Sequence, residues 1–335
     1  MTAGASPLLA VDGLTVSFGG GAAPVVRDVA FELHPGEVVA LVGESGSGKS
    51  TVALAAMGLL DGRGSEVGGR ILLARKQGGA SDLVRLGDRE FRSVRGNDIA
   101  MIFQEPMTSL DPIYRIGDQI GEALAIHRRL SRRDRQAEAL RLLTILGVPS
   151  PERTLERFPH ELSGGMRQRV MIAMAISCQP RLLIADEPTT ALDVTIQAQI
   201  VDQLRLQQQR TGMAILFITH DLGLVAEIAD RVLVMYAGQI VESGPVDQVF
   251  RSPRMPYTAG LMRSRPKLGG RRAGSGRIAA IPGSAPNPAA LPSGCAFHPR
   301  CSFAVAPACR TEAPPLDHVD EARRVRCIRW RAITP

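Results

Sequence analysis

Residues 43–51 read Gly-Glu-Ser-Gly-Ser-Gly-Lys-Ser-Thr, and this glycine-rich segment restricts the chain to few folds. It follows an apolar run at residues 37–42, which predicts a buried strand, and residues 48–60 beyond it have a helical pattern. A strand, a glycine-rich loop and a helix in this order predict a phosphate-binding loop, because backbone N–H groups can surround an anion there. The candidate phosphate-binding residues are Gly43, Glu44, Ser45, Gly46, Ser47, Gly48, Lys49, Ser50 and Thr51. We expect Lys49 to reach the β- and γ-phosphates of a nucleotide and Ser50 to hold Mg²⁺.

Two further segments carry chemistry that a phosphate-binding loop needs. Residues 182–188 read Leu-Leu-Ile-Ala-Asp-Glu-Pro, an apolar strand that ends in Asp186 and Glu187. Asp186 is placed to contact Mg²⁺, and Glu187 could accept a proton from an attacking water. Residues 162–168 read Leu-Ser-Gly-Gly-Met-Arg-Gln, a second glycine-rich anion signal. A hydrolase needs only the first loop, so the second suggests an ATP site that another molecule completes.

Strand and helix patterns alternate over most of the chain, which predicts an α/β fold with a mainly parallel sheet. Strands are predicted at residues 9–18, 25–33, 98–103, 181–185, 213–219, 232–236 and 239–242. Helices are predicted at residues 115–128, 131–146, 166–178 and 197–210. The charged helical patterns within residues 107–165 predict an inserted helical subdomain.

Composition limits the class of protein. The chain has 335 residues and a net charge of +7, and its lysines are Lys49, Lys76 and Lys267, so arginine dominates its basic residues. A basic balance could suit nucleic acid or an anionic membrane, or it could be a solvated surface. No apolar run is long enough for a membrane span, and the first residues lack the pattern of a secretory signal, so the cytoplasm is the default compartment.

Four of the five cysteines lie near the C-terminal end of the sequence. They are Cys295, Cys301, Cys309 and Cys327, beyond a Pro-, Gly- and Arg-rich segment at residues 263–292 that predicts a linker. In a reducing cytosol such a group favours a metal or iron–sulfur centre over disulfides. The predicted unit beyond the linker is small and separate. Cys178 falls on an apolar helix and is expected to be a small core residue.

The phosphate loop, the Leu-Ser-Gly-Gly-Met-Arg-Gln segment and Asp-Glu-Pro-Thr-Thr-Ala-Leu-Asp at residues 186–193 together resemble the ATPase subunit of an ABC transporter. The resemblance covers residues 9–250 and implies a RecA-like core, an antiparallel β-subdomain and an inserted helical subdomain within a nucleotide-binding domain at residues 1–250. It implies that Ser163, Gly164 and Gly165 close on the γ-phosphate held by an opposite subunit, and that Asp193 links the two ATP sites.

The same resemblance assigns roles to three other side chains. Phe18 resembles the aromatic residue that stacks on adenine, although a core aromatic at a strand end is the alternative. Gln104 is similar to the glutamine that senses Mg²⁺ and the attacking water, and it leads into residues 105–111, which would face a membrane partner. His220 resembles the switch histidine that contacts the γ-phosphate. With Glu187 and His220 both present, hydrolysis is expected rather than nucleotide binding alone, with Lys49 and Gln104 completing the catalytic set.

The C-terminal part of the sequence resembles one branch of these ATPases. Ile-Pro-Gly-Ser-Ala-Pro at residues 281–286 and Pro-Ser-Gly-Cys-Ala-Phe-His-Pro-Arg-Cys at residues 292–301 resemble the oligopeptide and dipeptide importer ATPases. The resemblance implies a C-terminal extension at residues 251–335 whose four cysteines could hold a [4Fe–4S] cluster. The spacing lacks a Cys-x-x-Cys pair, so zinc, disulfides, or no metal at all remain open.

The implied system is an ATP-driven importer of peptides or related small solutes. The resemblance implies two transmembrane permeases, a second and non-identical ATPase subunit, an extracytoplasmic solute-binding protein, and a peripheral position at the cytoplasmic face of the inner membrane. No nucleic acid is expected as a partner. The main alternative is an ABC ATPase that acts on nucleic acid or ribosomes, which would usually carry two cassettes or a long coiled coil. A regulatory ATPase subunit with a redox-sensing tail also remains open.

Overall fold

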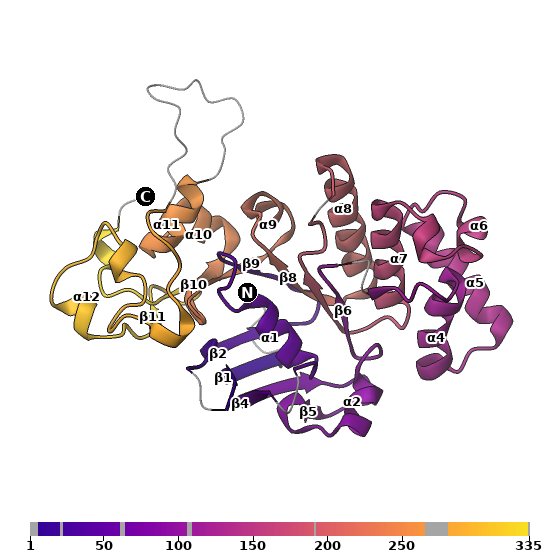
Figure 1. Ribbon diagram of the computed structural model, residues 1–335, viewed down its shortest axis with the longest axis horizontal. Helices are drawn as coiled ribbons and strands as arrows, with labels where there is room; N and C mark the ends of the chain where they lie inside the picture. Colours follow the sequence, from indigo (N-terminus) through magenta and orange to yellow (C-terminus); the bar gives the residue numbers. More distant parts are fainter. Residues whose placement is uncertain are drawn as a thin grey trace.

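The computed structural model describes residues 6–20, 23–60, 64–105, 109–190, 192–264 and 281–333. Most of the segment predicted as a linker, and part of residues 105–111, lie outside the described residues. Two sheets, with helices around them, make up the described part of the chain (Figure 1). Within the described residues, no helix combines the length and the apolar character needed to cross a membrane.

The smaller sheet is antiparallel, with strand order β2-β1-β4-β5. Its strands are β1 (Leu9–Phe18), β2 (Val26–Leu33), β4 (Ser65–Ala74) and β5 (Ala80–Asp82). Apolar side chains alternate along β1 and point to one face, where they pack with helix α1 (Lys49–Ala56). Strand β4 was not predicted, because Gly68 and Gly69 are typical of a turn. A Cβ atom on Gly69 would lie 2.4 Å from the carbonyl oxygen of Gly13, so the glycine serves a close approach of two strands.

The larger sheet forms the core, with strand order β11-β12-β10-β9-β3-β8-β7-β6. Its strands are β3 (Val38–Val42), β6 (Ile99–Ile102), β7 (Leu182–Asp186), β8 (Ala214–Thr219), β9 (Arg231–Tyr236), β10 (Gln239–Pro245), β11 (Asp317–His318) and β12 (Arg324–Val325). The strands from β9 to β6 pair in parallel, which confirms the predicted α/β class. Parallel strands are covered on both faces, and so their residues form nearly continuous apolar runs.

Helices cover the larger sheet and form a lobe beside it. They are α1, α2 (Asp88–Val94), α4 (Ile116–Arg128), α5 (Arg132–Ile145), α6 (Pro151–Leu155), α7 (Gly164–Ile176), α8 (Val194–Thr211), α9 (Leu222–Ile228), α10 (Val246–Arg251), α11 (Pro256–Arg263) and α12 (Ala308–Thr311). Figure 1 shows α4, α5, α6 and α7 together at one end of the molecule. Helix α7 begins two residues before the predicted start because Ser163 caps it.

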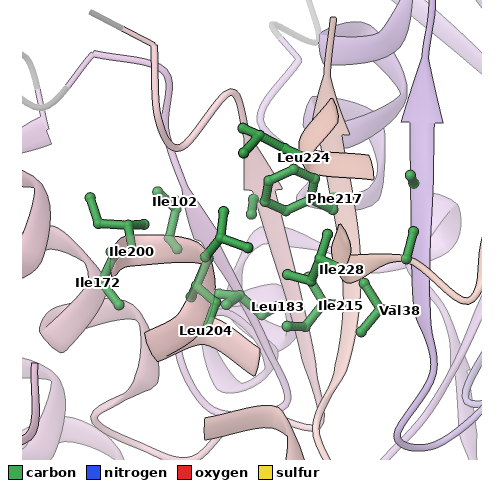
Figure 2. Packing of buried hydrophobic residues seen from close by; sticks show 14 of the residues in the cluster. Val38, Ile102, Ile172, Leu183, Ile200, Leu204, Ile215, Phe217, Leu224 and Ile228 are labelled. Atoms are coloured by element: carbon green, nitrogen blue, oxygen red, sulfur yellow. The ribbon is translucent and has the colours of Figure 1, made fainter. Parts of the chain in front are cut away.

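Two apolar clusters lie on opposite faces of the larger sheet. Along β3, Val38, Ala40 and Val42 belong to one cluster and Val39 and Leu41 to the other, as the two-residue period of a strand requires. Figure 2 shows the first cluster, in which strand side chains meet side chains from α7, α8 and α9. Because these side chains are buried, the sheet is held in place and positions the loops at its carboxyl edge.

The C-terminal extension joins the core instead of forming the separate unit that the sequence predicted. Strand β12 pairs with β10, and β11 pairs with β12, so the extension adds two strands to the edge of the core sheet. The carboxylate of Glu242 on β10 is fully buried and accepts hydrogen bonds from the Arg254 and Met255 N–H groups and from Arg323. These contacts join residues before and after the predicted linker.

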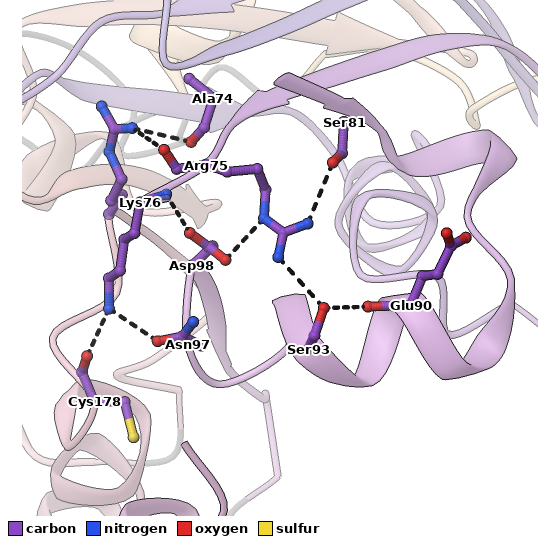
Figure 3. Close-up of polar contacts among 10 residues, drawn as sticks. Ala74, Arg75, Lys76, Ser81, Glu90, Ser93, Asn97, Asp98 and Cys178 are labelled. Carbon is purple, nitrogen blue, oxygen red and sulfur yellow. Dashed lines mark hydrogen bonds and ion pairs between the residues drawn. The ribbon is translucent and has the colours of Figure 1, made fainter. Parts of the chain in front are cut away.

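A buried carboxylate holds the two sheets and the helical lobe together. Asp98, which is 1% exposed, accepts hydrogen bonds at 2.9 Å from the Arg75 guanidinium and at 2.7 Å from the Lys76 N–H (Figure 3). The Lys76 ammonium donates at 2.8 Å to the carbonyl oxygen of Cys178, next to α7. Asp98 therefore neutralises a basic cluster where β4, β6 and α7 meet.

Replacement of Asp98 by asparagine should lower the free energy of unfolding by about 3 kcal/mol, because it leaves the Arg75 guanidinium facing an amide. Urea unfolding followed by circular dichroism measures the change. Arg85→Gln is the control, since its ion pair with Asp82 is on the surface, where the Arg85 side chain is 77% exposed. A surface pair contributes less than about 1 kcal/mol. Equal losses in the two variants would contradict the role of Asp98.

Candidate functional site: a phosphate loop and an acid–histidine group

The predicted phosphate loop connects β3 to α1. Lys49 is buried at the start of α1 and donates hydrogen bonds to the carbonyl oxygens of Gly43 and Glu44 at 2.9 and 3.0 Å. A Cβ atom on Gly43 would lie 2.2 Å from the carbonyl oxygen of Met235, so only glycine fits where the loop leaves β3. Ser45 and Gly46 are exposed, and so the loop opens to solvent at its middle. The loop can therefore receive an anion at the N-terminus of the helix.

Asp186 and Ser50 come together beside the loop. Asp186 ends β7 and is buried, and a side-chain hydrogen bond joins it to Ser50 on α1. Burial raises the pKa of Asp186, while the Ser50 hydroxyl and the nearby Lys49 ammonium oppose that shift. A hydroxyl and a carboxylate side by side next to a phosphate loop are the oxygen ligands that Mg²⁺ takes in such sites.

Glu187, Gln104 and His220 form one group at the ends of three neighbouring strands. One Glu187 carboxylate oxygen lies 3.2 Å from Nδ1 of His220, and the other accepts a hydrogen bond from Gln104 Nε2 at 3.3 Å. The His220 side chain is 64% exposed, so it borders solvent. The sequence predicted each residue separately, and the fold brings them together because β6, β7 and β8 are adjacent and parallel.

Thr190 is a member of this group that sequence reasoning missed. Its hydroxyl donates to the Glu187 carboxylate at 2.8 Å. Burial alone would raise the pKa of Glu187, but the hydrogen bonds from Thr190 and His220 and the nearby Lys49 charge hold that pKa below its usual value. Glu187 is therefore ionised at neutral pH and can accept a proton. The signal was present in the Thr-Thr pair at residues 189–190, but a surface turn explains such a pair equally well.

The second glycine-rich segment lies at an open helix end. Ser163 caps α7 by accepting a hydrogen bond from the Met166 N–H at 3.4 Å, and Ser163 and Gly164 are exposed. A Cβ atom on Gly164 would meet nothing within 4 Å. Asp193 caps α8 in the same manner and is exposed. The first N–H groups of a helix have no partner within it, and at the exposed Gly164 they can face an anion that arrives from outside the chain.

Phe18 ends β1, and its side chain is 39% exposed. It is not part of the core, so its ring is accessible for stacking. Two contacts to the phosphate loop were not foreseen: Arg300 and Tyr257, both beyond residue 250, contact Glu44. No pattern in the sequence around Arg300 or Tyr257 predicts a contact with Glu44.

The four C-terminal cysteines line one small apolar cavity, together with residues such as Met255 and Phe303. Two of the sulfurs accept a backbone N–H: Cys309 from Val305 at 3.5 Å and Cys327 from Arg329 at 3.4 Å. Burial raises the pKa of Cys295 and Cys301, and raises that of Cys327 to about 11.

The cavity contains the four thiols that a four-thiolate metal centre needs, but the thiols are too far apart to bind a metal. Within the described parts of the chain, no group of three or more His, Cys, Asp or Glu side chains lies close enough to hold a metal ion. All cysteines of the chain are free. Cys178 is buried at the end of α7, as predicted for a core residue. The donor chemistry therefore fits a cluster, and the thiols would have to move closer together and lose protons to bind one.

Comparison with known families identifies two regions. Residues 26–190 match the family described as ABC transporter, and residues 241–309 match the family described as Oligopeptide/dipeptide transporter, C-terminal region. The second match begins in β10 and includes three of the four cysteines that line the cavity, Cys295, Cys301 and Cys309.

Curated relatives match along the whole chain. A putative peptide import ATP-binding protein of Brucella abortus is 55% identical over 334 residues, which cover 98% of each chain. The dipeptide transport ATP-binding protein DppD of Escherichia coli is 48% identical over 322 residues, which cover 96% of each chain.

Solved structures match about seven tenths of the chain. A dimeric ATP-binding cassette in a post-hydrolysis state with ADP and Pi has 25% identity and a TM-score of 0.62, covering 71% of this chain and 98% of that chain. A Clostridium perfringens protein, cbiO1, which is part of an ABC transporter complex, has 28% identity and a TM-score of 0.61, covering 73% of this chain and 91% of that chain.

Proposed function

The chain belongs to the ABC transporter family, and on that basis we propose that it hydrolyses ATP to power the import of peptides or related small solutes. The observation that carries the proposal is the Glu187 carboxylate, which lies between His220 and Gln104 beside a preformed phosphate loop. The full-length similarity to DppD and to a peptide import protein supports peptides as the solute class.

The site residues then have distinct tasks. Lys49 and the loop N–H groups hold the phosphates, and Mg²⁺ at Ser50 and Asp186 offsets their charge. Glu187 accepts the proton of the attacking water, Gln104 and His220 orient that water, and Phe18 stacks on adenine. Because phosphoryl transfer depends on positioning and charge stabilisation, no covalent intermediate is needed.

The site is completed by a second ATPase subunit. Ser163, Gly164 and Gly165 contact the γ-phosphate bound to the opposite subunit, and Asp193 links the two sites. The exposed cap of α7 supports this arrangement, as does the solved dimer of a similar cassette. When the two ATPase subunits close on ATP, they would act on two transmembrane permeases at the cytoplasmic face of the inner membrane. In the full system a solute-binding protein delivers the solute, and the second ATPase subunit is non-identical.

The four cysteines of the extension are proposed to hold a [4Fe–4S] cluster, in a nucleotide-binding domain (residues 1–250) plus extension (residues 251–335) organisation. The support is the four-sulfur cavity, in which backbone N–H groups donate to the sulfurs of Cys309 and Cys327 and would stabilise bound thiolates. Iron, sulfide and zinc are assayed in protein purified without oxygen, and Cys301→Ser is the matched variant. Iron and sulfide that are both lost in Cys301→Ser support the cluster. Zinc alone, or a metal-free protein, would refute it.

The function is tested by reconstitution. The chain is co-expressed with two permeases and a second ATPase subunit of a peptide importer from the same organism, and the complex is inserted into vesicles with ATP inside. Uptake of radiolabelled dipeptides and longer peptides is expected, together with ATP turnover that the solute-binding protein stimulates. Vesicles with a non-hydrolysable ATP analogue are the control. ATP turnover without uptake of any peptide or small solute would refute the import function.

A further inference from the structure

The C-terminal extension reaches back to the phosphate loop. Arg300 lies in a short turn, His298–Arg300, and its guanidinium donates to both carboxylate oxygens of Glu44, at 2.7 and 2.9 Å. The Arg300 side chain is only 7% exposed, so this two-point ion pair is shielded from solvent. A planar guanidinium that meets a carboxylate at two points fixes both distance and orientation.

The Arg300 guanidinium is itself held in place. Its Nε donates to the carbonyl oxygen of Pro282 at 2.8 Å, and its Cζ lies 5.8 Å from the ring centre of Tyr236 and 5.9 Å from that of Phe297. Tyr236 and Phe297 pack edge to face, with ring centres 5.2 Å apart. The cation therefore lies against two aromatic rings, which favours a single position.

The extension also contacts the backbone of Glu44. The Glu44 N–H donates at 2.8 Å to the hydroxyl oxygen of Tyr257 on α11. Tyr257 is fully buried, and burial raises the pKa of its hydroxyl, so the oxygen remains a neutral acceptor. The Glu44 carbonyl oxygen accepts from the Lys49 ammonium. The same loop residue thus contacts the extension through its carboxylate and N–H group, and the phosphate-binding lysine through its carbonyl group.

We propose that Arg300 and Tyr257 are positioning residues for ATP binding, because they hold Glu44 and so keep the phosphate loop in the shape that receives the phosphates. The inference rests on the proposed function and deepens it by giving the peptide-importer extension a task at the ATP site. Neither side chain needs to touch the nucleotide. Without the contacts of Arg300 and Tyr257 with Glu44, ATP itself must order the loop. The free energy needed to order the loop then weakens ATP binding.

The test is a double-mutant cycle on the full chain, with the Kd of Mg-ATP measured by equilibrium dialysis. Arg300→Met and Glu44→Gln should each raise Kd about tenfold, and the double variant should do no more than either alone, because all three lose the same ion pair. Arg300→Lys should restore part of the affinity, because it keeps the charge but not the two-point geometry. Arg310→Met, on an exposed part of the extension, is the control and should leave Kd within about twofold of wild type.

Further readouts separate positioning from general stability. In the assembled transporter, the KM for ATP should rise while kcat at saturating ATP stays close to wild type, because bound ATP restores the loop. Tyr257→Phe, which removes only the hydroxyl oxygen that Glu44 contacts, should raise Kd in the same direction even if Arg300→Met folds poorly. Wild-type affinity in Arg300→Met and Tyr257→Phe, or additive effects in the double variant, would overturn the proposal. A wild-type chain that binds no ATP would refute the proposed function instead.

Discussion

Glu187→Gln should lower the steady-state ATP turnover of the assembled transporter by about 100- to 1,000-fold while ATP remains bound. The amide has the shape of the carboxylate and can still contact His220 and Gln104, which lie 3.2 and 3.3 Å from the acid. It cannot accept a proton, so the attacking water loses its base. Because hydrogen bonds keep the pKa of Glu187 below its usual value, the carboxylate of the wild-type protein is ionised at neutral pH. The full fall in ATP turnover is therefore expected at neutral pH.

The control for this prediction is Glu227→Gln, which makes the same change on an exposed face of α9. Phosphate release and retained nucleotide are both measured, since a variant that lost ATP would be inactive for a different reason. Turnover at the wild-type rate in Glu187→Gln, with Mg-ATP saturating, would show that another group accepts the proton.

The features predicted best from the sequence are those that depend on residues close together in the chain. The phosphate loop follows from spacing along nine residues, and the core strands follow from apolar runs such as Val38–Val42. Glu187, Gln104 and His220 were predicted one by one, the last two from the resemblance, and their meeting in one group was not predicted. The predicted features each depend on a short segment.

Contacts between distant segments could not be predicted. Arg300 and Glu44 are 256 positions apart, and neither has a neighbour pattern that names the other. The docking of β12 on β10 depends on a two-residue strand, which is too short to show a period. Strand β4 was missed because glycine is depleted in strands, whereas here Gly69 permits two backbones to touch. In each case the deciding partner is remote in sequence.

Lys49 is the lysine of the phosphate loop. Lys49→Met should raise the Kd of Mg-ATP by about 100-fold or more, because it removes the charge-assisted hydrogen bonds that the β- and γ-phosphates would receive. In the structure the Lys49 ammonium is held by the carbonyl oxygens of Gly43 and Glu44, with Asp186 and Glu187 nearby. Methionine fills a similar volume, so the loop loses its cation with little change in packing.

Lys76→Met is the matched comparison, because Lys76 also donates to a backbone carbonyl oxygen, that of Cys178, and burial lowers the pKa of both lysines. Lys76 lies in the cluster around Asp98, away from the loop, so its loss should cost about 1 kcal/mol of unfolding free energy and leave the Kd of Mg-ATP unchanged. Equilibrium dialysis and urea unfolding on both variants separate the two roles. If both variants lost ATP to the same extent, the loss would come from a damaged fold, and the phosphate contact assigned to Lys49 would be wrong.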